Sequence, residues 1–213
     1  MMKKCVLSML VLVMSVIVSV SQATIITNGS FDEGTETTGY VSGDSKVTGW
    51  SHNGGANCAM YHVNRNISDA YFPMAAPDTG SYYAGISASY IKNAYLYLYQ
   101  TLGTMEIGQE YEVSGYVNNG GAIGTQAYGY WQVKVGTTVL GTGELNNTWQ
   151  HFSFSYTATS TAPTLYLGYV DDESAGGTRS SVLYDLVTVE VVPEPISLVL
   201  IGLGSVMFRR RLS

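Results

Sequence analysis

Residues 149–158 read WQHFSFSYTA, and this stretch decides the fold class. Its aromatic side chains, Phe152, Phe154 and Tyr156, recur at every second position, with His151 and two serines filling the positions beside them. This alternation is that of an extended strand with one apolar and one polar face. The stretch therefore predicts a half-buried β-strand.

Similar segments recur along the chain, separated by clusters of Gly, Asn, Ser and Thr. No window outside the two ends shows the apolar period of a helix. Many short strands with frequent turns are typical of two antiparallel sheets packed face to face. We therefore expect an all-β antiparallel sandwich of jelly-roll type, preceded by a signal helix and followed by a short apolar helix. The expected strands are residues 24–31, 57–63, 82–86, 94–102, 110–118, 128–135, 149–158, 164–170 and 181–192.

Composition and charge exclude several classes of protein. The chain has 213 residues, with 24 Gly, 17 Tyr and only 12% charged residues. So few charges and so many strand and turn formers exclude a disordered chain, a coiled coil and a helical bundle. Residues 24–192 hold seven Asp and eight Glu against three Lys and two Arg, a formal charge of −10. We expect such an acidic domain to repel nucleic acids and anionic membranes.

The first 23 residues have the order of a secretory signal peptide. Lys3 and Lys4 give a positive start, and an apolar run follows over residues 5–20. Ser21 and Ala23 then place small residues where a signal peptidase reads the chain. We expect cleavage after Ala23. The alternative is an uncleaved membrane anchor.

Residues 193–213 have a second addressing pattern. Pro193, Glu194 and Pro195 precede an apolar run over residues 196–208, and three arginines follow it. A helix of this run would span about 20 Å, less than the roughly 30 Å of a bilayer core. The arginines would hold the extreme end in the cytoplasm, with the rest of the chain outside. The residues that define this addressing pattern are Pro193, Glu194, Pro195, Arg209, Arg210 and Arg211.

This order resembles the PEP-CTERM protein-sorting signal of exported bacterial proteins. The resemblance implies recognition by the membrane enzyme exosortase and processing near the motif. It also implies a chain that is anchored in the inner membrane in transit and then reaches the cell surface or the extracellular matrix. A plain C-terminal membrane anchor is the alternative.

The middle of the chain resembles the galactose-binding-like jelly rolls, a fold shared by many carbohydrate-binding modules. The resemblance covers nearly all of residues 24–192, and it implies a single β-sandwich domain. In one departure, Leu186 stands where family members often carry the second of two adjacent acids. The motifs that carry the resemblance are NGSFD at 28–32, GW at 49–50, QTL at 100–102, GQEY at 108–111, WQHFSF at 149–154 and LYDLV at 183–187.

An acidic residue in the last strand is a candidate metal ligand. Alternation places Asp185 on one face with Leu183, Val187 and Val189, a face that we expect to be buried. A buried carboxylate requires a cation or several hydrogen-bond donors. The family resemblance implies a structural Ca²⁺ that joins Asp32 to Asp185, and carboxylate oxygens suit this ion. Alternatively, Asp185 accepts backbone N–H groups at a bulge and binds no metal.

Tyrosines are the candidate ligand-binding residues. Tyr95, Tyr97 and Tyr99 alternate with leucines on one strand, so their rings share a face. Flat rings stack on the C–H faces of sugars, and phenol hydroxyls bond to sugar hydroxyls. Tyrosine also fits any pleated half-exposed surface, and a loop site around Trp50 is a rival. The predicted glycan-binding residues are Tyr97, Tyr99, Tyr116, Tyr128, Tyr130 and Trp50.

Catalysis has little support in the sequence. Its three histidines stand in separate segments, without the HExxH spacing of a zinc site, and no GxSxG motif is present. We therefore expect an exported, non-catalytic surface or matrix protein that binds exopolysaccharide or another glycan. A structural matrix or adhesion protein without a sugar site is the alternative, and a small glycan-active hydrolase is a third reading.

Overall fold

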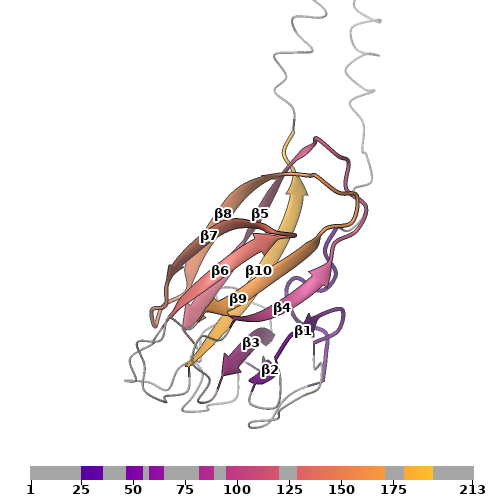
Figure 1. Ribbon diagram of the computed structural model, residues 1–213. Helices are drawn as coiled ribbons and strands as arrows, with labels where there is room; N and C mark the ends of the chain where they lie inside the picture. The colour runs from indigo at the N-terminus through magenta and orange to yellow at the C-terminus, as the bar shows by residue number, and fades with distance from the viewer. Residues whose placement is uncertain are drawn as a thin grey trace, which may run out of the picture.

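The computed structural model describes residues 25–35, 47–54, 58–64, 82–88, 95–119, 129–170 and 180–193. Two five-stranded sheets pack face to face, with the orders β1-β4-β9-β6-β7 and β2-β3-β10-β5-β8 (Figure 1). Neighbouring strands are antiparallel, which confirms the predicted all-β sandwich. The strands are β1 (Ser51–His52), β2 (Cys58–Asn64), β3 (Tyr82–Ala88), β4 (Tyr95–Thr101), β5 (Glu110–Asn119), β6 (Tyr130–Val135), β7 (Thr138–Glu144), β8 (Gln150–Thr157), β9 (Thr164–Val170) and β10 (Ser180–Val191).

The core lies between the two sheets. Leu98 and Leu167 reach it from the first sheet, Val113 and Tyr184 from the second, and all four side chains have no exposed surface. The hydroxyl of Tyr184 donates a hydrogen bond across the core to the backbone oxygen of Gly168, at 2.6 Å. Because the buried hydroxyl has a partner, the large ring can fill the core without an unsatisfied polar group.

Most of the predicted strands are confirmed to within a few residues, and residues 24–31 are the exception. The described part of that segment bends, because Asn28 and Phe31 have φ angles of 50° and 57°. The Asn28 side-chain amide donates to the backbone oxygens of Glu33 and Thr48, at 2.7 and 3.0 Å. These local bonds replace the ladder of a strand, so the prediction of a first strand here is wrong.

The last strand contains an irregularity that changes which side chains share a face. The register between β10 and β5 shifts between Asp185 and Thr188, and Leu186 has a φ of 49°. Val187 and Val189 therefore belong to the main core, whereas Leu183 packs in a second cluster with Tyr61. The predicted common face of Asp185 with Val187 and Val189 is wrong, because the bulge reverses the alternation.

The two predicted addressing segments lie almost wholly outside the described residues. Ala23 and the stretch from Glu194 onward are not among them, so both predicted helices stay predictions. Pro193 is the last described residue, and it is exposed. Within the described ranges, no helix has the length and apolar character needed to cross a bilayer.

Candidate functional site: a tyrosine face on one sheet

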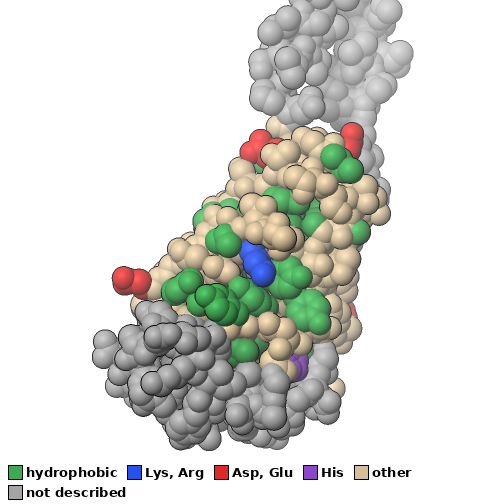
Figure 2. Space-filling model, in the orientation of Figure 1, with side chains coloured by type: hydrophobic (Ala, Val, Ile, Leu, Met, Phe, Trp, Pro, Cys, Tyr) green, Lys and Arg blue, Asp and Glu red, His purple; other side chains and the backbone are tan. Residues whose placement is uncertain are grey.

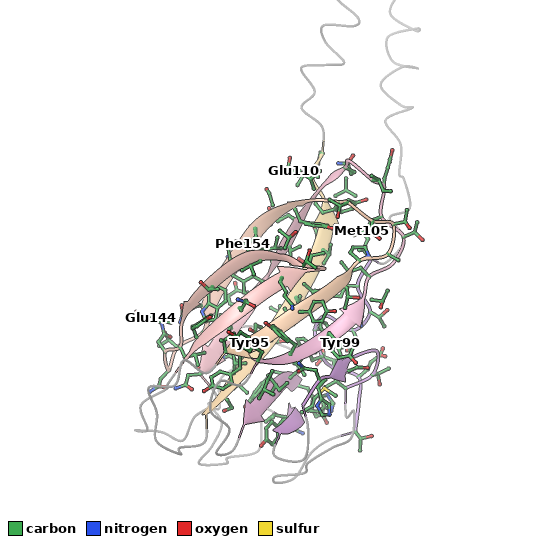
Figure 3. The ribbon with its side chains drawn as sticks, in the orientation of Figure 1. Tyr95, Tyr99, Met105, Glu110, Glu144 and Phe154 are labelled. Carbon is green, nitrogen blue, oxygen red and sulfur yellow. The ribbon has the colours of Figure 1, made fainter. Side chains whose placement is uncertain are left out.

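Tyrosines gather on the outer face of the β1-β4-β9-β6-β7 sheet. Residues paired across an antiparallel ladder project from the same side of the sheet. Across β4, β9 and β6, one row of paired residues is Tyr99, Tyr166 and Lys134. The next row on the same side is Tyr97, Gly168 and Gln132. Figure 3 shows labelled Tyr95 and Tyr99 along β4. We call this surface the tyrosine face, and its residues are Tyr95, Tyr97, Tyr99, Tyr130, Gln132, Lys134 and Tyr166.

Tyr97 lies across the middle of this face. A Cβ atom on Gly168 would stand 2.4 Å from Cε1 of Tyr97, so the ring lies directly over the glycine backbone of β9. The Tyr97 hydroxyl reaches beyond β9 to β6 and donates to Oε1 of Gln132 at 2.7 Å. Only 6% of Tyr97 is exposed. Burial, followed by the nearby Tyr130 and Tyr95, raises the pKa of Tyr97 above 10.0, so its hydroxyl is a donor at neutral pH.

Lys134 lies over two tyrosine rings at the centre of the face. Its Nζ is 4.3 Å from the ring centroid of Tyr97 and 4.4 Å from that of Tyr166. The two rings meet edge to face, with centroids 5.5 Å apart. Each such cation–π contact contributes about 0.5–1 kcal/mol at an exposed site. The long side chain of Lys134 is therefore held against the sheet, with its charge at a fixed place.

The rings differ in how much surface they offer to a ligand. Tyr95 is 59% exposed, whereas Tyr99, Tyr130 and Tyr166 are partly buried. Tyr99 and Tyr166 are tilted by 35° with centroids 5.8 Å apart, so neither covers the other completely. Partly exposed rings beside a lysine and a glutamine combine apolar stacking surface with hydrogen-bonding groups. Sugar rings, which have C–H faces and hydroxyl rims, need this combination.

The structure does not bring all the predicted glycan residues together. Tyr97, Tyr99 and Tyr130 share the tyrosine face, whereas Tyr116 lies on β5 of the opposite sheet, where its ring meets His151 with centroids 5.0 Å apart. Tyr116 therefore does not share a surface with the other predicted glycan-binding tyrosines. Tyr128 lies outside the described residues.

Trp50 is a core residue and not part of a loop-tip site. It is 2% exposed, packs on Phe31 with ring centroids 5.1 Å apart, and donates from Nε1 to the backbone oxygen of Asn28 at 3.1 Å. A ring enclosed in this way has no face left for a ligand. The loop reading of Trp50 is wrong because residues 28–31 fold back over it.

Sequence reasoning misses Tyr166, Gln132 and Lys134 as members of the face. Alternation within 164–170 separates Tyr166 from the buried Leu165 and Leu167, so its orientation could have been found. Its position beside Tyr99 depends on the pairing of β4 with β9, two strands far apart in the chain. Pairing between distant strands leaves no local signal in the sequence.

The two candidate calcium ligands differ in environment. Asp185 is 1% exposed, and its Oδ1 accepts a hydrogen bond from the backbone N–H of Leu186 at 2.8 Å. Asp32 is exposed. No group of three or more His, Cys, Asp or Glu residues that could hold a metal occurs within the described ranges. Calcium takes roughly six to eight oxygens, so a site here would need several backbone carbonyls, and calcium at Asp32 and Asp185 stays a prediction.

Comparisons with known proteins give distant likenesses of fold. No protein-family model and no curated protein matches the sequence. A xylan-binding CBM22 domain of Paenibacillus barcinonensis Xyn10C is 16% identical, with a TM-score of 0.49 over 78% of this chain and 94% of that one. TmCBM61, solved with β-1,4-galactotriose, is 12% identical, with a TM-score of 0.49 over 80% of this chain and 100% of that one. A CBM4 structure is 17% identical, with a TM-score of 0.43 over 78% of this chain and 99% of that one. Likenesses this distant do not identify the ligand of this chain.

Proposed function

We propose that this protein is an exported, non-catalytic β-sandwich that binds a glycan chain on its tyrosine face. The observation that supports the proposal is the arrangement around Tyr97: partly exposed tyrosine rings surround a lysine and a glutamine on three neighbouring strands. Rings supply stacking surface, and the phenol, amide and ammonium groups supply hydrogen bonds. The face crosses β4, β9 and β6, so it suits an extended polymer better than a single small sugar.

A binding role fits this surface better than hydrolysis does. Most glycosidases use two carboxyl groups about 5–9 Å apart, on either side of the scissile bond. Strand registers place Glu144 on the tyrosine face, opposite Tyr130, and no second carboxylate of the described strands projects from it. Glu110 and Glu112 belong to β5 of the other sheet, where Glu112 pairs with Glu190. A hydrolytic pair is therefore not available on this face within the described part of the chain.

The proposed destination of the protein rests on its two ends. Lys3, Lys4 and the apolar run to Ala23 support export through a signal peptide. The order of Pro193–Pro195, apolar run and arginines supports recognition by an exosortase and delivery to the cell surface or the extracellular matrix. There the tyrosine face would meet exopolysaccharide. A structural calcium at Asp32 and Asp185 would belong to the scaffold and not to the glycan site.

The test is a glycan array probed with the full-length protein and with matched tyrosine variants. Tyr99→Ala and Tyr166→Ala each remove a partly exposed ring of the face, and we expect about a tenfold loss of affinity from either change. Tyr116→Ala is the control, because it removes a partly exposed ring from the opposite sheet and should leave binding unchanged. Absence of binding to both neutral and acidic glycans would overturn the proposal in favour of a matrix or adhesion protein held by protein contacts.

A further inference from the structure

Lys134 is the only lysine or arginine among the described residues, and it lies at the centre of the tyrosine face. Figure 2 shows blue side-chain atoms between green and tan ones on the visible face, with red atoms at the margins of the visible surface. The strands around Lys134 contribute tyrosines, a glutamine and a glycine. In an acidic domain, the one described cation therefore coincides with the proposed binding surface.

No described carboxylate neutralises this charge. Lys134 has contacts with the rings of Tyr97 and Tyr166 but no ion pair with any carboxylate of the described chain. Glu144 of β7 lies on the same face, where it pairs with Tyr130 of β6. Tyr130 is four residues before Lys134 on that strand. That separation is about 14 Å along the strand, beyond the reach of an ion pair. Among the described residues, the neighbours of the ammonium group are the neutral rings of Tyr97 and Tyr166.

The two rings fix the position of the charge without removing it. Nζ stands 4.3 and 4.4 Å from the ring centroids, and the side chain remains partly exposed. A flexible lysine must give up rotamer freedom when it binds an anion, but a lysine already held against two rings has less freedom to lose. The Tyr97 hydroxyl already donates to Gln132, so the phenol donors open to an anion here are those of the partly exposed Tyr99 and Tyr166. The arrangement suits a carboxylate that lies among sugar hydroxyls.

We infer that the glycan bound by this face is acidic, and that Lys134 binds the carboxylate of a uronic acid residue while the neighbouring tyrosines stack on its ring. This inference rests on the proposed function and names its class of ligand. The net charge of the domain acts against a polyanion at long range, but it is screened over about 8 Å at physiological salt. Glu112 and Glu190 carry part of that charge on the opposite sheet. Recognition of the acid is therefore local to Lys134.

The experiment uses two polyuronates, polygalacturonate and alginate, each beside its carboxyl-reduced neutral form with the same backbone. Binding to the full-length protein is measured in chelator, so that calcium cannot bridge the two partners. We expect at least tenfold tighter binding to one acidic polymer than to its reduced form, and a preference that shrinks as salt rises. Equal or tighter binding to the reduced form would overturn the inference while leaving the proposed function intact. Failure to bind these four polymers and every glycan on the array would overturn both.

Two substitutions test the role of the lysine itself. Lys134→Gln should reduce the ratio of acidic to neutral binding toward one, whereas Lys134→Arg should keep a preference for the acidic polymer. Tyr99→Ala should weaken binding to the acidic polymer and leave the preference ratio in place. Thermal unfolding of each variant confirms that it is folded. An unchanged preference in folded Lys134→Gln would overturn the assignment.

Discussion

At the scale of single residues, Gly168 determines the shape of the tyrosine face. A hydrogen atom in place of a side chain lets the Tyr97 ring lie on β9, and a Cβ there would stand 2.4 Å from Cε1 and 2.6 Å from Cδ1 of that ring. The ring then reaches Gln132, and Lys134 lies over it. One glycine thus positions a tyrosine, a glutamine and a lysine from two different strands.

Gly168→Ala should therefore displace Tyr97 and break its hydrogen bond to Gln132. We expect a loss of about 1–3 kcal/mol in the free energy of unfolding, together with weaker glycan binding. Urea denaturation and the glycan assay measure the two effects. Thr164→Ala is the control on the same strand, and it should change stability by no more than about 0.5 kcal/mol. Equal stability of the Gly168 variant and the wild type would contradict this account.

Because the hydroxyl of Tyr184 is buried, we expect the folded protein to lose stability at alkaline pH. Burial raises the pKa of Tyr184 well above 10.0, although backbone hydrogen bonds to Gln132 and Gly168 lower it in part. The unfolded chain releases this proton near pH 10, whereas the folded chain retains it. The contribution of Tyr184 to the free energy of unfolding is therefore fully present below pH 10 and declines as pH rises above it. The slope is about 1.4 kcal/mol per pH unit for each such group.

Tyr184→Phe isolates this contribution. The variant should lose about 1 kcal/mol at pH 7 because the bond to Gly168 is gone, and its stability should then fall less steeply than that of the wild type between about pH 10 and 11. Urea denaturation over this pH range measures both slopes. Parallel slopes in the two proteins would show that Tyr184 is not responsible for the alkaline loss.

At the scale of elements, β7 shows how side chains far away in sequence determine a strand. A Cβ on Gly141 would stand 2.2 Å from Cζ of Phe154, and one on Gly143 would stand 2.5 Å from Cζ2 of Trp131. Both glycines make room for aromatic rings of other strands. Glycine normally weakens a strand, so the sequence of β7 reads as a turn-rich segment. Its pairing with β6 and the rings beside it explain why it is extended.

Gly141→Ala should destabilise the sandwich by about 1–3 kcal/mol, because Phe154 has to move out of its packed position. Thr142→Ala changes the next residue, whose side chain is exposed, and serves as the control with an effect near zero. Thermal or urea unfolding compares the two. A Thr142 variant as unstable as the Gly141 variant would mean that the strand is sensitive to any change.

Strands with one face in the core are the elements of this fold that can be predicted from the sequence. Alternation of apolar and polar residues identifies β8, β4 and β5, because each has one face in the core. It fails across Asp185–Thr188, where the bulge reverses the faces, and it cannot assign Tyr116 and Tyr99 to opposite sheets. Faces within a strand follow from local pattern, whereas the sheet that each strand joins follows from contacts between distant segments.

The turn at residues 28–31 and the bulge of β10 give the calcium prediction its test. The backbone N–H of Val187 donates to the oxygen of Gly29 at 2.8 Å, so the two elements are in direct contact. If calcium binds Asp32 and Asp185, the melting temperature should be higher in calcium than in chelator, by an amount that grows with calcium concentration. Asp185→Asn retains an oxygen for the Leu186 N–H and should abolish this difference. Equal melting in calcium and in chelator would exclude the ion.

At the scale of the whole molecule, the prediction concerns which residues remain after export. In a bacterial host that has an exosortase, the mature protein should begin at Thr24 and should lack the arginines at its end. Mass spectrometry of the surface fraction measures both ends. Recovery of the intact wild-type chain in the membrane fraction would favour the plain anchor over the sorting signal. If an exosortase recognises the motif, the double variant Pro193→Ala, Pro195→Ala should stay intact in the membrane fraction.

The place of β10 has a mechanical consequence. This strand runs from Ser180 to Val191 in the middle of its sheet, between β3 and β5, and the described chain ends two residues later at Pro193. Hydrogen bonds in antiparallel ladders lie across the strand direction. A pull on the C-terminal end therefore loads the ladders of β10 in shear, many bonds at once, instead of peeling them one at a time. A domain tethered at this end while a polymer drags on its other sheet would resist force through β10, the longest of the described strands.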